Sequence, residues 1–242
     1  MCTVTYIPTG NRAFITSNRD EHVSRKALLT PKKELLNGLK VVYPKDKTAG
    51  GTWFALNENG TVTVLLNGAA QNHERQPPYR KSRGLIVLDI VSKFEPVAYL
   101  KEIDLKGIEP FTLIVYKDSV LFEFRWDAVQ KQLKQLDAAL PHIWSSWTLY
   151  NKAAQLKRND HFQDFVNGTI EFERASILDF HRTDHGDAEN GFVIDRSNGL
   201  KTLSISQAIV GAEEIRLNHH DLTSDEMVSQ ALPINSPIRA TS

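Results

Sequence analysis

The sequence predicts an α+β protein in which antiparallel strands and helices occupy separate layers. Two observations support this prediction. Short segments rich in β-branched residues are joined by turn residues, which is typical of antiparallel hairpins. Helical segments come in adjacent pairs, so the order along the chain is strands, helices, strands, helices, strands. A parallel sheet would instead require strands and helices in regular alternation.

Two hairpins are predicted in the first third of the chain. In the first, an alternating segment at 2–7 and a second strand at 12–18 flank the turn residues 8–11. In the second, two strands flank a turn at 57–60, which reads Asn-Glu-Asn-Gly. Residues 22–50 between the hairpins are polar and rich in lysine with no firm period, so we expect a long loop there.

The rest of the chain is predicted to contain two helix pairs and further strands. Ser82 is placed to cap a helix over 83–94, and Pro96 lies near the start of a second helix. Strands follow Pro110, with a tight turn at Lys117 and Asp118. The later predicted elements are helices at 149–167 and 169–183 and strands at 191–199, 201–210 and 213–220. We expect residues 1–242 to form a single domain, with 227–242 as a loose C-terminal tail.

Composition and charge narrow the classes of partner. Lys plus Arg and Asp plus Glu are equal at 29 each, so no basic excess indicates binding to nucleic acid or to a membrane surface. The longest apolar runs are too short to cross a bilayer, and the start of the chain does not resemble a signal peptide. We therefore expect a cytoplasmic protein that acts on a small-molecule substrate or ligand, with a homo-oligomer left open.

The one cysteine in the chain is Cys2, so no internal disulfide can form. Removal of Met1 would make Cys2 the N-terminal residue, which carries both a thiol and a free α-amine. A thiolate is strongly nucleophilic, and the amine has a reference pKa of about 7.7 to 8.0, close enough to neutrality to accept a proton. Nucleophile and base would then belong to one residue. The alternative is that Cys2 is an inert small apolar residue.

Three polar residues are predicted to lie near Cys2. Arg19 and Asp20 end the strand that would pair with the Cys2 strand. Arg19 would lower the thiol pKa or hold a substrate carboxylate, and Asp20 would accept hydrogen bonds from the ammonium or the thiol. Asn67 ends a later strand, where its amide would donate to an oxyanion. Considered alone, each motif is also ordinary turn material.

These segments together resemble a known family. The start "MC", the motif "NRDE" at 18–21 and the segments "WFALNENG" and "LLNG" resemble the NRDE family, which is related to the transport-and-Golgi-organisation proteins. "SRG" at 82–84 fits the same pattern as a helix start. That family is similar to the cholylglycine-hydrolase branch of the N-terminal nucleophile (Ntn) hydrolases. The resemblance implies a four-layer αββα sandwich of two antiparallel sheets between helix layers.

The resemblance also implies roles for individual residues. Cys2 resembles the nucleophile, Arg19 and Asp20 its activating pair, and Asn67 the oxyanion donor. We expect Asn18, Ser145 and Ser146 to contact the substrate. Ser145 or Ser146 stands where the hydrolases have an asparagine, a departure from the full amidase pattern. A late arginine of the hydrolases has no assigned counterpart in this chain.

Two functions from different classes follow. The first is an amidase-like Ntn hydrolase that cleaves a non-peptide carbon–nitrogen bond of a linear amide or similar acyl compound, and it needs no metal or cofactor. The second is a non-catalytic carrier of a small hydrophobic ligand such as haem or lipid, as proposed for some NRDE proteins. An incidental cysteine in a soluble α+β protein is the third interpretation. The group of acids and histidines at 181–187 matches no standard metal site, and His219 and His220 are interpreted as a surface pair.

Overall fold

Hairpins with clear turn signals form as predicted. The computed structural model of the protein describes residues 3–25 and 27–234. β1 (Thr3–Thr9) pairs with β2 (Arg12–His22), and β5 (Phe54–Asn57) pairs with β6 (Val62–Asn67). Gly60 closes the second turn with a φ of 75°, which a residue without Cβ adopts at low cost. Both hairpin predictions are confirmed.

The prediction of a long loop over residues 22–50 is wrong. β3 (Lys32–Leu36) and β4 (Leu39–Tyr43) form a third hairpin within it. Its two-residue turn is Asn37-Gly38, with φ values of 50° and 83°, and Asn-Gly is a strong sequence signal for this kind of turn. β3 is an edge strand with exposed lysines, so it lacks the apolar alternation that would identify a strand.

The strands form two antiparallel sheets. The six-stranded sheet has the order β10-β1-β2-β11-β12-β13, and the seven-stranded sheet has the order β3-β4-β5-β6-β7-β8-β9. The strands not yet named are β7 (Phe111–Lys117), β8 (Val120–Trp126), β9 (Lys131–Leu136), β10 (His142–Ser145), β11 (Leu200–Val210), β12 (Glu214–Asp221) and β13 (Glu226–Pro233). The turn between β7 and β8 is at Asp118 and Ser119, one residue later than predicted.

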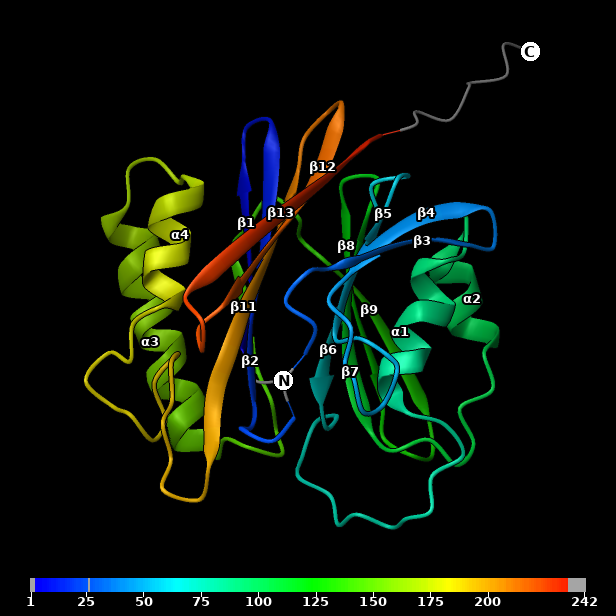
Figure 1. The fold of residues 1–242 in the computed structure, drawn as a ribbon, viewed down its shortest axis with the longest axis horizontal. Coiled ribbons are helices and arrows are strands. Elements are labelled where there is room, and N and C mark those ends of the chain that lie inside the picture. The colour runs from blue at the N-terminus through cyan, green and yellow to red at the C-terminus, as the bar shows by residue number, and fades with distance from the viewer. Residues whose placement is uncertain (1–2, 26, 235–242) are drawn as a thin grey trace.

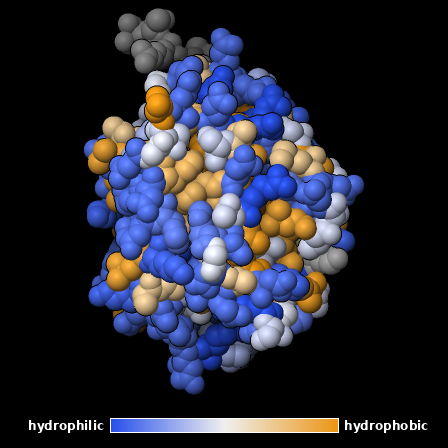
Figure 2. Space-filling model, turned by 90° about the vertical axis from the view of Figure 1, so that its left-hand side faces the viewer, coloured by the Kyte–Doolittle hydropathy of each residue, from blue (hydrophilic) through white to orange (hydrophobic). Residues whose placement is uncertain are grey.

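Helices cover the outer face of each sheet (Figure 1). α1 (Arg83–Val91) and α2 (Pro96–Glu102) cover the seven-stranded sheet, and α3 (Lys152–Gly168) and α4 (Arg174–His181) cover the six-stranded one. The Ser82 hydroxyl caps α1 as predicted. The face formed by α3 and α4 is mostly hydrophilic, with apolar side chains scattered over it (Figure 2). None of the helices in the described residues is long and apolar enough to span a bilayer.

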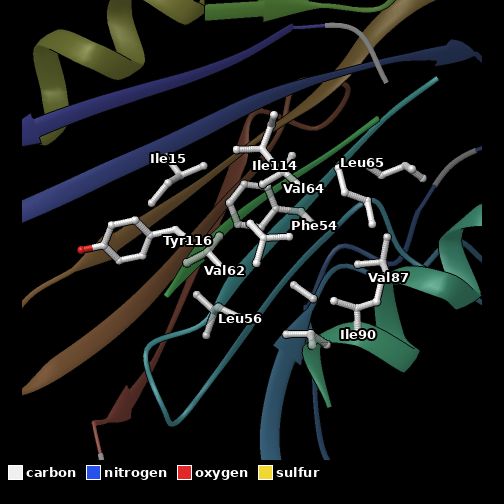
Figure 3. Close-up of a cluster of buried hydrophobic side chains, with 14 of the residues drawn as sticks. Ile15, Phe54, Leu56, Val62, Val64, Leu65, Val87, Ile90, Ile114 and Tyr116 are labelled. Atoms are coloured by element: carbon white, nitrogen blue, oxygen red, sulfur yellow. The ribbon is translucent and has the colours of Figure 1, made fainter. Parts of the chain in front are cut away.

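One apolar core joins the two sheets. Ile15 of β2 points toward Val62 and Tyr116 of the seven-stranded sheet, and Val87 and Ile90 of α1 pack on the opposite side of that sheet (Figure 3). A smaller apolar cluster, which includes Phe14 of β2, lies between the six-stranded sheet and the helices α3 and α4. The layers are therefore helices, sheet, sheet, helices, which confirms the predicted αββα sandwich.

The expected tail from residue 227 is wrong for the part that the structure describes. Residues 227–233 belong to β13, which pairs along the whole of β12. Leu232 is fully buried in the main core. The alternating pattern of this strand is weak because most of its side chains are exposed or half-buried. Residues 235–242 lie outside the described residues.

Candidate functional site

The central strand of the six-stranded sheet carries the NRDE residues. β2 lies between β1 and β11, and Thr3 at the start of β1 is opposite Asn18. Side chains alternate along β2. Ile15 belongs to the core between the sheets, and Phe14 belongs to the cluster under the helices. Cys2, the predicted nucleophile, lies outside the described residues.

Arg19 lies between the two sheets and is almost fully buried. Its Nη2 atom donates to Asp46 Oδ2 at 3.2 Å, and its guanidinium lies over the Trp53 ring at 4.6 Å. Burial lowers the pKa of Arg19, and the charges of Glu21 and Asp46 oppose that shift. The Nη1 atom is buried and has no hydrogen-bond partner among the described residues.

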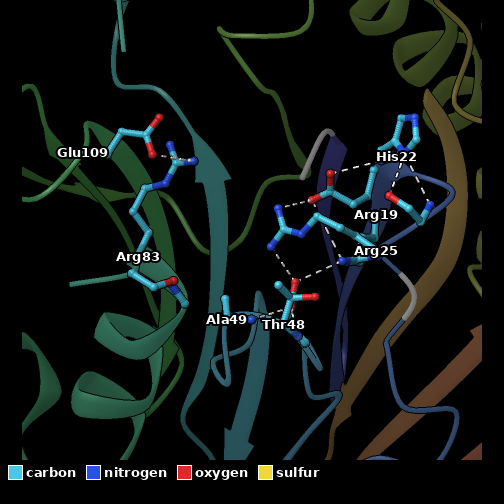
Figure 4. Close-up of polar contacts among 12 residues, drawn as sticks. Arg19, His22, Arg25, Thr48, Ala49, Arg83 and Glu109 are labelled. Atoms are coloured by element: carbon cyan, nitrogen blue, oxygen red, sulfur yellow. Dashed lines mark hydrogen bonds and ion pairs between the residues drawn. The ribbon is translucent and has the colours of Figure 1, made fainter. Parts of the chain in front are cut away.

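The carboxylate that holds Arg19 comes from the segment predicted as a loop. Asp46 accepts from the backbone N–H groups of Thr48 and Ala49, both at 2.9 Å, and pairs with Arg25 at 2.9 Å (Figure 4). Burial opposes ionisation of Asp46, but these hydrogen bonds and the two arginines more than offset it, so its pKa lies below the ordinary value. Sequence reasoning missed Asp46 and Arg25. The one local sequence feature that could have indicated Asp46 is the Gly-Gly turn that follows it a few residues later.

Arg19 and Asn67 line the same small pocket. The pocket has a volume of about 90 Å³ and lies where β2, the end of β6, the loop 46–53 and the start of α1 meet. The Asn67 side-chain amide makes no hydrogen bond with another described residue. Arg83 at the α1 N-terminus also lines the pocket and pairs with Glu109 at 3.1 Å (Figure 4).

Asp20 belongs to a different set of contacts. Tyr150 Oη donates to Asp20 Oδ2 and Thr202 Oγ1 donates to Asp20 Oδ1, both at 2.5 Å. Asp20 and Tyr150 are both buried. The structure therefore separates the predicted activating pair, because the Arg19 contacts lie toward the seven-stranded sheet and these Asp20 contacts come from β11 and the loop before α3.

Asn18 is in the protein interior and does not line the pocket of Arg19 and Asn67. Its Nδ2 atom donates to the carbonyls of His181 and Phe192 at 2.9 and 2.8 Å, and its Oδ1 contacts the His181 ring. These bonds attach α4 and the following loop to β2. The structure thus gives Asn18 an architectural position in place of the expected substrate contact.

The two serines are placed differently from each other. Ser146 is buried, and its hydroxyl donates to the Asn67 carbonyl at 2.9 Å, so it fixes the end of β6 and makes no contact with this pocket. Ser145 lines a second cavity of about 310 Å³ beside β10. Trp144 and Trp147 form part of its wall, and Arg125 and Lys152 also line it.

The histidines singled out in the sequence lie in the protein interior or in the loop after α4. No group of three or more metal-ligating side chains occurs within residues 3–25 and 27–234. His219 and His220 do not form a surface pair, because both are buried. His219 packs beside Trp53 with a ring separation of 6.0 Å and is bonded to the Ser206 hydroxyl at 3.0 Å. The strand β13, which sequence analysis assigned to the tail, covers the β12 edge.

A family comparison bears on this geometry. The family model described as Transport and Golgi organisation 2 matches residues 1–187. The chain belongs to this family. The match includes β2, which carries Arg19 and Asp20, and β6, which carries Asn67, and it confirms the resemblance to NRDE proteins. A comparison with curated protein sequences gave no match.

Three solved structures of other proteins are similar to this chain. An ortholog of N-acylethanolamine-hydrolyzing acid amidase from Caenorhabditis elegans is 12% identical, with a TM-score of 0.56, over 85% of this chain and 92% of that chain. Two variants of conjugated bile acid hydrolase from Clostridium perfringens are each 10% identical. Their TM-scores are 0.47 and 0.48; the first comparison covers 95% of this chain and 96% of that one, and the second covers all of both. At such identity the likeness to the amidase shows a common fold.

Proposed function

We propose that this protein is an Ntn hydrolase that cleaves a non-peptide carbon–nitrogen bond of a linear amide or acyl compound. Cys2 would be the nucleophile after removal of Met1. The observation that carries this proposal is the pocket shared by Arg19 and Asn67, two donors from different sheets. The Arg19 Nη1 atom and the Asn67 amide are both without a hydrogen-bond partner in the described part of the chain.

The pattern of β1 supports placing the Cys2 thiol beside this pocket. Val4 and Tyr6 belong to the core between the sheets, whereas the Thr5 hydroxyl is bonded to His181 of α4 at 2.7 Å. We propose that this alternation continues to residue 2, which would place its side chain on the face of Val4. That face is also the one from which Arg19 reaches Asp46 and Trp53. A fixed guanidinium near a thiol favours the thiolate.

The reaction would proceed in two steps. In the first, the Cys2 sulfur bonds to the amide carbon and the carbonyl oxygen takes up negative charge, which the Asn67 amide stabilises. The α-amine of Cys2 takes the thiol proton and passes it to the leaving nitrogen as the carbon–nitrogen bond breaks. In the second step, water adds to the thioester carbon, the carbon–sulfur bond breaks, and a proton returns to sulfur as the carboxylic acid leaves.

The name of the amidase that shares the fold suggests substrates for testing. That protein is named as an ortholog of an amidase that hydrolyses N-acylethanolamines. We propose the same broad class for this chain, a small linear amide, in a cytoplasmic protein that does not bind nucleic acid or membranes. The proposal includes no oligomeric state, and a homo-oligomer is compatible with it. No metal or organic cofactor enters the two steps above.

A second function is favoured by the cavity beside β10. Its volume of about 310 Å³ exceeds the roughly 90 Å³ of the Arg19 pocket. Small-molecule sites are usually at least about 300 Å³ and mostly apolar. The walls here include Leu66, Trp144, Trp147 and Leu156. In this alternative the protein binds a small hydrophobic ligand such as haem or lipid without turning it over.

One experiment separates the two functions. Intact mass first establishes whether Met1 is removed, and retained Met1 contradicts the α-amine mechanism. A panel of N-acyl amides of increasing chain length is then assayed with wild type, Cys2→Ala, Asn67→Ala and the exposed control Asn11→Ala. We expect turnover that is abolished in Cys2→Ala, reduced by about 10²–10³ in kcat for Asn67→Ala, and unchanged in Asn11→Ala.

The outcomes differ clearly. Turnover that persists in folded Cys2→Ala contradicts the hydrolase proposal. Saturable binding of haem or a fatty acyl compound without turnover, with equal affinity in Cys2→Ala, supports the carrier instead. Trp144→Ala and Trp147→Ala should then weaken that binding, since both residues line the larger cavity.

A further inference from the structure

The larger cavity beside β10 lies at one end of the space between the two sheets. One of its walls is a row across β6, β7 and β8, because Leu66 is opposite Thr112 and Thr112 is opposite Arg125. Side chains alternate along a strand, so this row shares the face of Val62. Ile15 of the six-stranded sheet points toward that face (Figure 3). The row therefore faces the other sheet.

The opposite walls are largely apolar and come from β10, the loop after it and α3. Trp144 of β10 and Trp147 of the loop line the cavity, and both are half-buried. The first turns of α3 contribute four side chains from one side of the helix, namely Lys152, Gln155, Leu156 and Asn159. Leu156 is 54% exposed. An apolar ligand in this cavity would remove the exposed parts of these side chains from water, which favours binding.

The charged side chains of the cavity have an excess of cations. The described residues that line it include Arg125 and Lys152 but no acid. Glu123 pairs with Arg125 Nη2 at 3.1 Å, and the same carboxylate oxygen accepts from the Trp144 indole at 2.8 Å. Lys152 is exposed and makes no ion pair with a described acid. Two cations and one acid leave an excess positive charge of one beside apolar walls.

We propose that this cavity binds a single-chain amphiphile that carries a carboxylate. The apolar chain lies against the tryptophans and Leu66, and the carboxylate pairs with Arg125, to which Lys152 adds a second positive charge. A guanidinium binds a carboxylate with defined geometry, and an ammonium on a flexible stem acts as a point charge. Charge complementarity selects this ligand over a neutral chain. The inference deepens the second function proposed above and rests on it, but it does not require the proposed role of Cys2.

Two compounds of equal chain length test the preference. Decanoate carries a carboxylate and decan-1-ol carries a neutral hydroxyl. Tryptophan fluorescence reports binding of either, because two of the four tryptophans line the cavity. The variants are Arg125→Met and Lys152→Met, which remove one charge each and keep an apolar stem. Lys33→Met is the control, because Lys33 is exposed on the edge strand β3, away from β8 in the sheet order.

We expect wild type to bind decanoate about tenfold more tightly than decan-1-ol, which is the effect of one charge-assisted hydrogen bond. Arg125→Met should weaken decanoate binding about tenfold and leave decan-1-ol binding unchanged. Lys152→Met should weaken decanoate binding by about twofold to fivefold, because an exposed ion pair contributes less. Lys33→Met should match wild type for both compounds.

The outcomes separate this inference from the functions proposed above. Equal affinity of wild type for the two compounds overturns the inference and leaves the second function intact, since a neutral chain would then be bound as well. Binding of neither compound overturns both. An unchanged preference in folded Arg125→Met also overturns the inference, and Lys152→Met decides the same point if Arg125→Met does not fold. Turnover by wild type and Cys2→Ala is a separate measurement, so the hydrolase proposal can fail without affecting this result.

Discussion

At the scale of single residues, two histidines are held neutral in the interior. His181 is fully buried between Thr5 and Asn18, and burial is the main reason that its pKa is lowered to about 3, with the charges of His185 and Arg158 adding to the shift. His219 lies between the sheets, where burial lowers its pKa to about 4. The charge of Asp221 opposes this lowering of the His219 pKa, and the charge of Arg19 adds to it.

We predict that the free energy of unfolding decreases as the pH falls below about 6.5, the ordinary pKa of histidine. Both folded-state pKa values are depressed, so between about pH 6.5 and 4 the unfolded chain binds more protons than the folded one. The stabilisation is complete above pH 6.5 and is lost as the pH falls through 4 for His219 and 3 for His181. Each histidine contributes a slope of up to about 1.4 kcal/mol per pH unit.

Urea unfolding at pH 7, 6 and 5 measures this slope. His219→Phe keeps an aromatic ring beside Trp53 but cannot titrate. The slope of its unfolding free energy against pH should therefore be smaller than that of wild type by the contribution of one histidine. Loss of the Ser206 hydrogen bond lowers the absolute stability of this variant without changing its pH dependence. Equal slopes for wild type and His219→Phe contradict the assignment.

At the scale of elements, the candidate pocket depends on how closely the loop 46–53 approaches the start of α1. A Cβ on Gly51 would lie 2.4 Å from the Gly84 carbonyl carbon and 2.7 Å from the Leu85 nitrogen. The Thr52 N–H donates to the Gly84 carbonyl at 3.1 Å. Two glycines thus allow the loop that carries Asp46 to lie against the helix end.

We expect Gly51→Ala to destabilise the fold by about 3 kcal/mol, because backbone atoms cannot move aside as a flexible side chain would. Gly10→Ala is the matched control, since a Cβ there would meet no heavy atom within 4 Å. It should change stability by no more than about 0.5 kcal/mol. Chemical denaturation of the three proteins provides the comparison, and equal midpoints and slopes would refute the close packing.

The start of α3 is also held by a cap. Asn151 Oδ1 accepts from the Ala154 N–H at 2.9 Å, which satisfies one of the free donors of the first helical turn. We expect Asn151→Ala to lower stability by about 1 kcal/mol and Asn151→Asp to retain it. Thermal unfolding of both variants tests this, and a loss in Asn151→Asp as large as in Asn151→Ala would show that the cap is not the cause.

At the scale of the whole molecule, the last described strand closes the six-stranded sheet. β13 pairs along the whole of β12, and Leu232 is buried in the core that both sheets share. β12 itself contributes Leu217 to that core and is next to β5 of the other sheet. Loss of β13 would expose the β12 edge as well as apolar surface.

We therefore predict that a chain ending at Asp225 is strongly destabilised. The loss should be at least the roughly 2–5 kcal/mol that removal of one buried leucine costs, with aggregation through the exposed edge. A chain ending at Ile234 keeps every described contact of β13 and serves as the control. Urea unfolding and size-exclusion chromatography measure both effects, and similar behaviour of the two chains would contradict the structural role of β13.

Much of the fold could be predicted because its signals are local. The alternation of segments 2–7 and 12–18 with a turn between them predicts a hairpin, as does Asn-Glu-Asn-Gly before β6. Ser82 and Pro96 mark helix starts. β3 and β13 were missed because edge strands expose polar side chains and lack apolar alternation. The surface position predicted for His219 and His220 is wrong, because β12 is an inner strand between β11 and β13 and both side chains are buried.

The sequence by itself determined the layer order and the family resemblance, and it indicated Cys2, Arg19 and Asn67 as candidate site residues. Each depends on neighbouring residues or on position along a strand. Only the tertiary structure decided that Asp46 holds Arg19 across 27 positions, that Tyr150 holds Asp20 across 130, and that Arg158 reaches Thr3 across 155. The physical reason is that these charges and hydroxyls act at a few ångströms, and no local pattern records which distant segments the core brings within that range.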